Sequence, residues 1–381
     1  MKAWYYVHKW SSLLPMVFLL MLCVTGLPLI FAHEIDHWLH DVEAPELSGD
    51  VGPASVDAIL ADARSRRPGD AVQFLVAEPE EPDLWYVRMG TSPLSSDMSA
   101  FYTYDARTGE FLYDYPLGRG FMDVMLRLHV DMYAGLPGTL FLGAMGVLLL
   151  VSIVSGAVLY APFMRKLPFG RVRRSRSVRV KWLDVHNLLG IVTLVWLFVV
   201  SLTGVINTLS IPIFGQWQST ELAEMTAPYL HEEPVSGYGS VDAVLDTIDE
   251  TAPEKALSFL AFPGNDFASP GHYVAFMQGT TALSSKLLTP ILIDAGSAAF
   301  VETRDLPWYV QTLLLSQPLH FGDYGGMPMK LLWALLDILA IVVLGSGVYL
   351  WLKARNVGFE SWLGRVEESR QTALASRSVT E

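Results

Sequence analysis

The sequence is poor in the residues and motifs that mark many soluble enzymes. It contains one cysteine, Cys23, so no disulfide can form within the chain. Charged residues make up 17% of it, against about 25% in a typical globular protein. No G-x-S-x-G, P-loop or G-x-G-x-x-G sequence occurs. These absences argue against a disulfide carrier, an α/β-hydrolase, a P-loop nucleotidase and a Rossmann-type flavin or nicotinamide domain.

Apolar residues are abundant instead, at 51% of the chain, and the mean hydropathy is +0.34. Four stretches are apolar and long enough to cross a bilayer, which takes about 20 residues of helix. The first follows Lys2 and Lys9, as a signal peptide would, but it is too long for one and offers no small-residue cleavage site, so we expect a retained helix. The expected transmembrane helices run approximately over 12–31, 140–160, 188–209 and 331–352.

Basic residues are concentrated between the second and third apolar stretches. The positive-inside rule places that loop in the cytoplasm, and with four spans both termini are then cytoplasmic as well. Lys353 and Arg355, just after the fourth stretch, agree with this orientation. The long segments over about 33–125 and 210–325 are therefore expected outside. The basic residues of the loop are Arg165, Lys166, Arg171, Arg173, Arg174, Arg176, Arg179 and Lys181.

Acidic residues gather in the two outer segments. Glu78, Glu80 and Glu81 lie in the first, and Asp242 and Asp246 in the second. The net charge of −13 is thus a property of the exported side of the protein. It argues against a nucleic-acid partner and suits a cationic or neutral ligand better than an anionic one.

The chain repeats itself at long range. The second apolar stretch and the residues before it align without a gap to the fourth, and the first aligns in the same way to the third. Each half is therefore expected to consist of a helix, an outer lobe and a second helix. The matched residues are His8 with His186, Thr25-Gly26 with Thr203-Gly204, His129 with His320, and Ser155-Gly156 with Ser346-Gly347.

The outer segments repeat as well, and they predict a small α+β lobe in each half. Ser55-Val56-Asp57-Ala58 recurs as Ser240-Val241-Asp242-Ala243, and Leu94-Ser95-Ser96 recurs as Leu283-Ser284-Ser285. A helix is expected over 56–67. Strands are expected over 73–77, 84–89, 101–105 and 110–113 in the first lobe, and over 257–262, 272–277 and 288–294 in the second.

The expected fold is thus that of a mostly α integral membrane protein, with four transmembrane helices in two duplicated halves and a small α+β lobe in each. Its parts are the first helix (1–32), the first lobe (33–125), the second helix with an outer extension (126–160), a basic loop (161–185), the third helix (186–209), the second lobe (210–316), the fourth helix with an outer extension (317–353) and a cytoplasmic tail (354–381).

Four of the nine histidines occupy equivalent places in the duplication. His8 and His186 both lie at the cytoplasmic end of a span, and His129 and His320 both precede a span on the outer side. A lone histidine near a membrane interface is more often an anchor or a satisfied core residue. Two helices that offer one imidazole each at the same depth are, however, what a bis-histidine haem needs. We therefore expect these four to bind two haem irons, one at each face.

Small and aromatic residues in the spans bear on this expectation. The matched Gly26 and Gly204 allow a flat macrocycle to come close, although they allow close helix packing equally well. Trp196 and Trp333 are candidates for bridging the two sites in electron transfer, although aromatic residues within spans more often serve packing.

An alternative rests on His33-Glu34-Ile35-Asp36-His37, which spells H-E-x-x-H. On a helix this spacing places two imidazoles on one face to bind zinc, with the glutamate as general base, and His40 is a candidate third ligand. The motif has no counterpart in the second half and lies at a membrane exit rather than in a cleft. It indicates a cluster that anchors the helix end or receives a metal-bearing substrate, more than a zinc peptidase.

The residues around the four histidines resemble those of the PepSY-associated transmembrane proteins of bacteria. The shared features are His8 before Thr25-Gly26 and Glu34-Ile35-Asp36, Leu128-His129 before Ser155-Gly156-Ala157-Val158-Leu159-Tyr160, His186 before Thr203-Gly204, and His320 before Gly347. Within that family, the chain is similar to the inner-membrane ferric-siderophore reductases linked to ferrioxamine.

The resemblance implies four spans, two periplasmic PepSY-like lobes, two haem b groups held by histidines, and reduction of Fe(III) in a ferric siderophore at the periplasmic face. The electron donor is then expected in the cytoplasm or in the quinol pool, because the chain has no flavin domain of its own. An alternative from another class is a siderophore permease or binding module with structural histidines, and it predicts a protein without a b-type haem spectrum.

Overall fold

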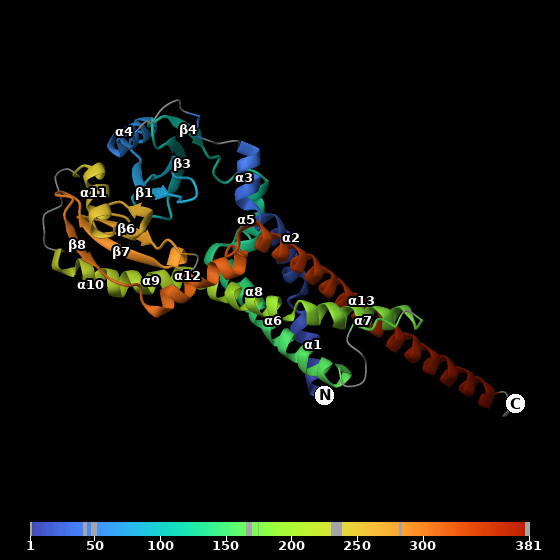
Figure 1. Ribbon diagram of the computed structural model, residues 1–381. Coiled ribbons are helices and arrows are strands. Elements are labelled where there is room, and N and C mark those ends of the chain that lie inside the picture. The colour runs from blue at the N-terminus through green and yellow to red at the C-terminus, as the bar shows by residue number, and fades with distance from the viewer. Residues whose placement is uncertain are drawn as a thin grey trace. The chain divides into compact units, whose positions relative to one another are not determined.

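A computed structural model describes residues 2–40, 44–46, 52–164, 170–173, 175–229, 238–281 and 284–377 (Figure 1). Four residues used above, Arg165, Lys166, Arg174 and Leu283, lie outside the described residues. The chain divides into two compact units. A helical unit comprises Met1–Leu27, Phe141–Leu202 and Leu331–Glu381, and a sheet unit comprises Pro28–Leu140 and Thr203–Lys330.

The helical unit is built from long apolar helices. Within the described residues, two segments are long and apolar enough to cross a membrane, Gly135–Ala161 of α6 and Gly326–Lys353 of α13. Two further candidates are helix pairs, α1 with α2 and α7 with α8, bent by 53° and 63°. The described residues therefore contain two to four candidate membrane-crossing segments. The bounds are α1 (Lys2–Leu13), α2 (Met16–Leu29), α6 (Gly135–Met164), α7 (Val178–Val192), α8 (Leu194–Asn207) and α13 (Gly326–Arg377).

Both bends occur at the same place in the duplication. The first lies at Pro15, which has no N–H group and clashes with the preceding helical turn. The second lies at Thr193, which follows His186 by as many residues as Pro15 follows His8. The Thr193 hydroxyl donates to the Leu189 carbonyl at 2.9 Å. Because the bend is present with and without proline, it belongs to the architecture of the unit.

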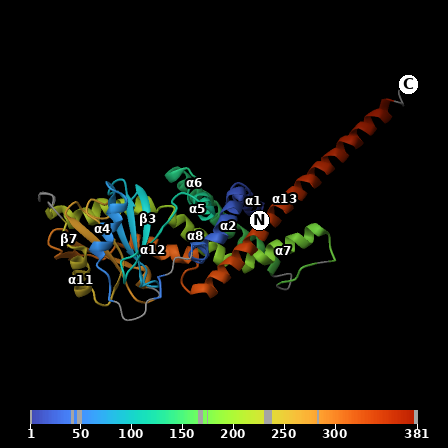
Figure 2. The same cartoon turned by 90° about the horizontal axis from the view of Figure 1, so that it is seen from above.

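The sheet unit contains one antiparallel sheet in the order β4-β3-β2-β1-β5-β6-β7-β8. The first outer segment supplies β1 to β4 and the second supplies β5 to β8, side by side in Figure 2. They meet where β1 pairs with β5, with Leu75 opposite Leu260. The strands are β1 (Ala71–Ala77), β2 (Leu84–Gly90), β3 (Met98–Asp105), β4 (Phe111–Asp114), β5 (Ala256–Ala261), β6 (His272–Gln278), β7 (Leu288–Asp294) and β8 (Phe300–Thr303).

Helices cover both faces of this sheet (Figure 1). On one face, α4 (Val56–Arg66) and α11 (Val241–Thr251) bury Leu60 and Val244 against Leu75 and Leu260. On the other face, Trp217 packs against Phe276 together with other apolar residues of α9, α10 and α12. These helices are α9 (Ser210–Trp217), α10 (Ala223–Thr226) and α12 (Trp308–Phe321). The sheet is thus the middle layer of three, because alternate residues of its central strands face two apolar helix surfaces.

The helices α4 and α11 cap each other. The Asp242 carboxylate of α11 accepts hydrogen bonds from Ser55 Oγ at 2.5 Å and from Val56 N at 2.7 Å, at the start of α4. The Asp57 carboxylate of α4 accepts in turn from Ser240 Oγ and from Val241 N, the latter at 2.8 Å. The free N–H groups at each helix start are therefore satisfied by the opposite half of the chain.

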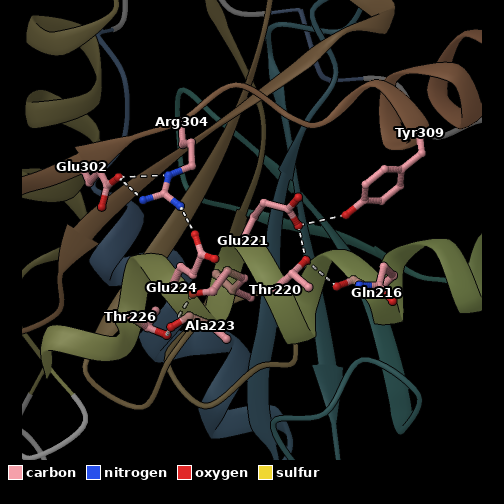
Figure 3. A network of polar contacts seen from close by, with 10 residues as sticks. Gln216, Thr220, Glu221, Ala223, Glu224, Thr226, Glu302, Arg304 and Tyr309 are labelled. Atoms are coloured by element: carbon pink, nitrogen blue, oxygen red, sulfur yellow. Dashed lines mark hydrogen bonds and ion pairs between the residues drawn. The ribbon is translucent and has the colours of Figure 1, made fainter.

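A π-helical turn, Gln218–Leu222, joins α9 to α10 and is held by a polar network (Figure 3). The Glu221 carboxylate accepts a hydrogen bond from the Tyr309 hydroxyl at 2.8 Å. Arg304 bridges Glu302 at 2.7 Å and Glu224 at 3.1 Å. The network ties this turn to α12 and to the chain just beyond β8, and so fixes the layer below the sheet.

Short helices stand outside the long spans. They are α3 (Ala32–His40), α5 (Phe121–Val130), and the single turns Ala227–Tyr229 and Ser284–Lys286. The chain leaves α5 through Met132, Tyr133 and Gly135, all with positive φ, and only then begins α6. Likewise α12 ends at Gly322 in the left-handed region before α13 begins. His129 and His320 therefore lie on separate helices and not on extensions of the spans.

The strands expected from the sequence are present, but they do not form two separate lobes. Both outer segments contribute to one sheet with a shared apolar core. The sequence pattern missed β8, which is only four residues long. Pairing between β1 and β5 joins residues far apart in the chain, so no local pattern could predict it.

Candidate functional site

The helical unit brings His8 of α1 and His186 of α7 together. Their ring centres are 6.4 Å apart and their planes are inclined by 69°. One imidazole comes from each half of the duplication. The pair therefore meets as the matched positions in the sequence suggested.

The His8 ring is held by α6. Its Nδ1 lies 2.9 Å from the Ser152 carbonyl oxygen and 3.3 Å from Ser155 Oγ. A carbonyl only accepts hydrogen bonds, so Nδ1 of the neutral ring carries the proton and Nε2 presents a lone pair. Within the described part of the chain, His8 Nε2 has no hydrogen-bond partner. This is the tautomer that binds metal through Nε2.

His186 is held by α13 in the same way. Its Nδ1 lies 3.1 Å from the Val343 carbonyl oxygen and 3.0 Å from Ser346 Oγ. Val343 and Ser346 are the positions that match Ser152 and Ser155 in the duplication. Each histidine is thus oriented by its own half of the chain, and its ring lies next to the ring of the other half's histidine.

The sheet unit contains the second pair. His129 of α5 and His320 of α12 have ring centres 6.1 Å apart, with planes inclined by 62°. His320 Nδ1 lies 3.4 Å from Thr203 Oγ1 of α8. Again one imidazole comes from each half.

Glycines form the close walls of these sites. A Cβ atom at Gly156 would lie 3.0 Å from His8 Cε1, and one at Gly204 would lie 2.9 Å from His320 Cε1. A Cβ at Gly347 would lie at an ordinary 3.6 Å from His186 Cε1. At positions 156 and 204, any residue other than glycine would place its Cβ atom closer to an imidazole ring than an ordinary contact.

The donor set fits a haem iron better than a free metal ion. Two metal–imidazole bonds of about 2 Å, plus roughly 1 Å from each nitrogen to its ring centre, place two ring centres about 6 Å apart across one metal. Both pairs have that spacing. No cluster of three or more His, Cys, Asp or Glu side chains suited to a metal occurs among the described residues. Each pair would offer one nitrogen from each imidazole, a donor set that would suit an iron whose other ligands come from a porphyrin.

The H-E-x-x-H segment lies on α3. The Glu34 carboxylate is in an ion pair with Lys330, at 2.7 Å. Burial opposes its ionisation, but hydrogen bonding and charge from Lys330 outweigh that effect and lower the pKa of Glu34. His33 Nε2 is 3.8 Å from Glu81. The side chains of His37 and His40 lie outside the described residues. Glu34 is thus an ion-pair partner in this arrangement, and its pKa shift is opposite to that of a general base near neutral pH.

The helical unit also contains the two tryptophans expected to bridge the sites, and one acidic residue, Asp337, that the sequence-based prediction did not include. Trp196 and Trp333 contact each other edge to face, with ring centres 6.4 Å apart. Asp337 is buried in α13, next to Cys23 of α2. The signal was present in the sequence, since Asp337 is an acidic residue inside an otherwise apolar stretch.

Comparison with known proteins adds to this geometry. The model of the PepSY-associated TM region matches residues 5–354. The chain belongs to this family. All four histidines of the two pairs lie within the matched residues of this PepSY-associated TM protein. A protein of Pseudomonas aeruginosa, described as uncharacterized, is 24% identical to it over 258 residues. That match covers 61% of this chain and 64% of the relative's length.

Proposed function

We propose that this PepSY-associated TM protein is a haem-dependent reductase of the bacterial inner membrane, which passes electrons across the membrane to Fe(III) in ferric siderophores. The observation that carries the proposal is the repeated histidine pair. Both pairs have ring centres about 6 Å apart, and the first has both Nδ1 atoms bound to carbonyl oxygens.

The proposed topology has four spans, with the two bent helix pairs each crossing once. Both termini and the basic loop between α6 and α7 are then cytoplasmic, and the sheet unit is periplasmic. In this orientation His8 and His186 would hold one haem b toward the cytoplasm. His129 and His320 would hold the other toward the periplasm.

The residues of the chain have defined tasks in this proposal. His8 and His186 would bind iron through Nε2, while the Ser152 and Val343 carbonyls keep both rings in the required tautomer. Because they lack a Cβ atom, Gly156 leaves room for the His8 ring and Gly204 leaves room for the His320 ring. The haem groups, when bound, supply one-electron transfer. The electron comes from a cytoplasmic reductase or from a quinol.

Reduction is a chemically sensible way to release siderophore iron. Hard oxygen donors hold Fe(III) much more strongly than Fe(II), so one electron weakens the complex. The acidic residues of the sheet unit favour a cationic or neutral siderophore. In such a protein the sheet unit would bind the substrate and the membrane helices would deliver the electron.

The test is the absorption spectrum and haem content of the purified protein. We expect a b-type spectrum with two haems per chain. His8→Ala and His186→Ala should each lose the same haem, and His129→Ala and His320→Ala should each lose the other. His33→Ala, at an exposed position outside both pairs, is the control and should keep both.

A colourless protein would refute the reductase and favour a siderophore permease or binding module with structural histidines. Loss of different haems by the two members of a pair would refute the pairing. Zinc-dependent proteolysis makes a different prediction, because Glu34→Gln would abolish it without affecting haem content.

A further inference from the structure

The apolar part of α13 contains a buried carboxyl group that neither histidine pair uses. Asp337 is 6% exposed and lies inside the candidate span Gly326–Lys353. Its Oδ2 atom has no hydrogen-bond partner among the described residues. An ionisable side chain is costly to place in such surroundings, so its presence points to a function.

Few ionisable groups face Asp337. Cys23 of α2 is in hydrogen-bond contact with it, and it is the only ionisable residue of that helix. α8 has no ionisable side chain, and α6 has none before Tyr160. Among the described residues, Cys23 is the one side chain that acts on Asp337, and no ion pair to Asp337 occurs there.

Two hydrogen-bond donors without acceptors lie in the same region. Trp333 precedes Asp337 by one helical turn, on the same face of α13. It contacts Trp196, and the indole Nε1 atoms of both residues are buried without a partner within the described residues. Unused N–H donors within about one helical turn of a carboxyl group can stabilise its ionised form when it loses its proton.

Asp337 lies on the approach to the first histidine pair. His186 Nδ1 bonds the carbonyl of Val343, which is six residues further along α13, or about 9 Å along the helix axis. Ala340, three residues after Asp337, is also buried and lies on the same face of the helix as Asp337. In the gap-free alignment of the two halves, the place of Asp337 is taken by Gly146 of α6. Only the second half supplies this acid.

We propose that Asp337 is a redox-linked proton site. Its carboxylate binds one proton when one electron enters the His8–His186 site, and it releases that proton when the electron moves on. Added negative charge is poorly screened in a medium of low dielectric constant, so a nearby group that gains a proton lowers the energy of the reduced state. The electron comes from the reductant and the proton from hydronium in the solvent: one O–H bond of hydronium breaks, leaving water, and one O–H bond forms at the carboxylate. The inference rests on the proposed haem function.

The test is a redox titration of each haem with dithionite and mediators at a series of pH values. In the wild-type protein, the midpoint potential of the haem lost in His186→Ala should fall as pH rises, approaching one proton per electron. Asp337→Asn, which has the same size but cannot ionise, should lose at least two thirds of that slope. Asp337→Glu should retain it. Asp323→Asn, which removes an exposed acid of the sheet unit, is the matched control and should behave as wild type.

A second measurement does not depend on any variant. The infrared difference spectrum between the oxidised and reduced wild-type protein should show a carboxylic acid C=O band that appears on reduction. A wild-type slope retained in Asp337→Asn, or no such band in the wild type, would overturn the inference while two bound haems still support the reductase. Absence of haem is the separate outcome that removes the reductase and this inference together.

Discussion

At the scale of single residues, the two histidine pairs depend on how closely backbone approaches imidazole. The backbone comes closest to an imidazole at Gly156 and Gly204, where an added Cβ atom would lie inside the ordinary van der Waals distance from the histidine ring. Gly347 occupies the place that matches Gly156, yet its distance from His186 is ordinary. At this repeated position the first half therefore requires glycine, whereas the second half has room for a Cβ atom.

This difference predicts a graded response to alanine. Gly156→Ala and Gly204→Ala should each displace the neighbouring imidazole, costing about 1–3 kcal/mol of overpacking, and under the proposed function each should lower the content of one haem. Gly347→Ala should keep both haems. Haem-to-protein ratios of the purified variants measure the effect. Equal haem loss in all three variants would contradict the stated distances.

A second residue-scale feature lies in the turn after β3. The Asp105 side chain is fully buried and bonds Arg107 at 2.9 Å. Hydrogen bonds from the Arg107 side chain hold the pKa of Asp105 below its ordinary value. A carboxyl group with a lowered pKa in the folded state stabilises the fold above its unfolded pKa of about 4, and that stability is lost as the pH falls through the folded value.

Arg107→Gln should therefore destabilise the sheet unit by about 2 kcal/mol at neutral pH, and the difference from wild type should shrink as the pH falls from about 5 to about 3. Thermal unfolding in detergent at several pH values measures it. Arg119→Gln, at an exposed position, is the control and should follow the wild type. A stability difference between Arg107→Gln and wild type that grows as the pH falls would contradict a lowered pKa of Asp105.

At the scale of elements, the mutual capping of α4 and α11 links the two halves of the chain. Each aspartate serves the opposite helix, so one substitution affects two elements. Asp57→Ala and Asp242→Ala should each cost about 1 kcal/mol, the usual value of a helix cap. The double variant should cost less than the sum if both caps stabilise one shared contact.

Equilibrium unfolding of the four proteins of this cycle measures the coupling. Asp246→Ala, an exposed acid in the middle of α11, is the matched control and should have little effect. Strict additivity would show that the two caps act independently.

The sequence could predict elements well where the pattern is local. Seven strands, α4 and the apolar helices follow from alternation, length and hydropathy, and the pairing of His8 with His186 follows from the duplication. The bend at Thr193 could not be predicted, because threonine is compatible with a continuous helix. Thr203 beside His320, and Asp337 beside Cys23, depend on how helices pack, which no short motif determines.

At the scale of the whole molecule, the single sheet makes the two outer segments one structural unit. Leu75 and Leu260 face each other at its centre, and both are fully buried. Leu75→Ala should cost about 2–5 kcal/mol and should weaken strands of both segments together. Hydrogen exchange should show faster exchange in β6 as well as in β2. Leu94→Ala, at an exposed site, is the control. Faster exchange confined to the first segment would indicate two independent lobes.

Both histidine pairs and the central strand pairing combine one member from each half of the chain, which bears on how the chain arose. Each pair takes one imidazole from each half, and β1 meets β5 antiparallel, as two copies related by a twofold axis would. A half-length ancestor would have had single imidazoles and an unpaired edge strand, so it could have completed either site only as a homodimer. Fusion of two such copies would then allow the two halves to differ in sequence. An acid could arise at Asp337 while its counterpart stayed Gly146, a difference that no symmetric dimer could have encoded.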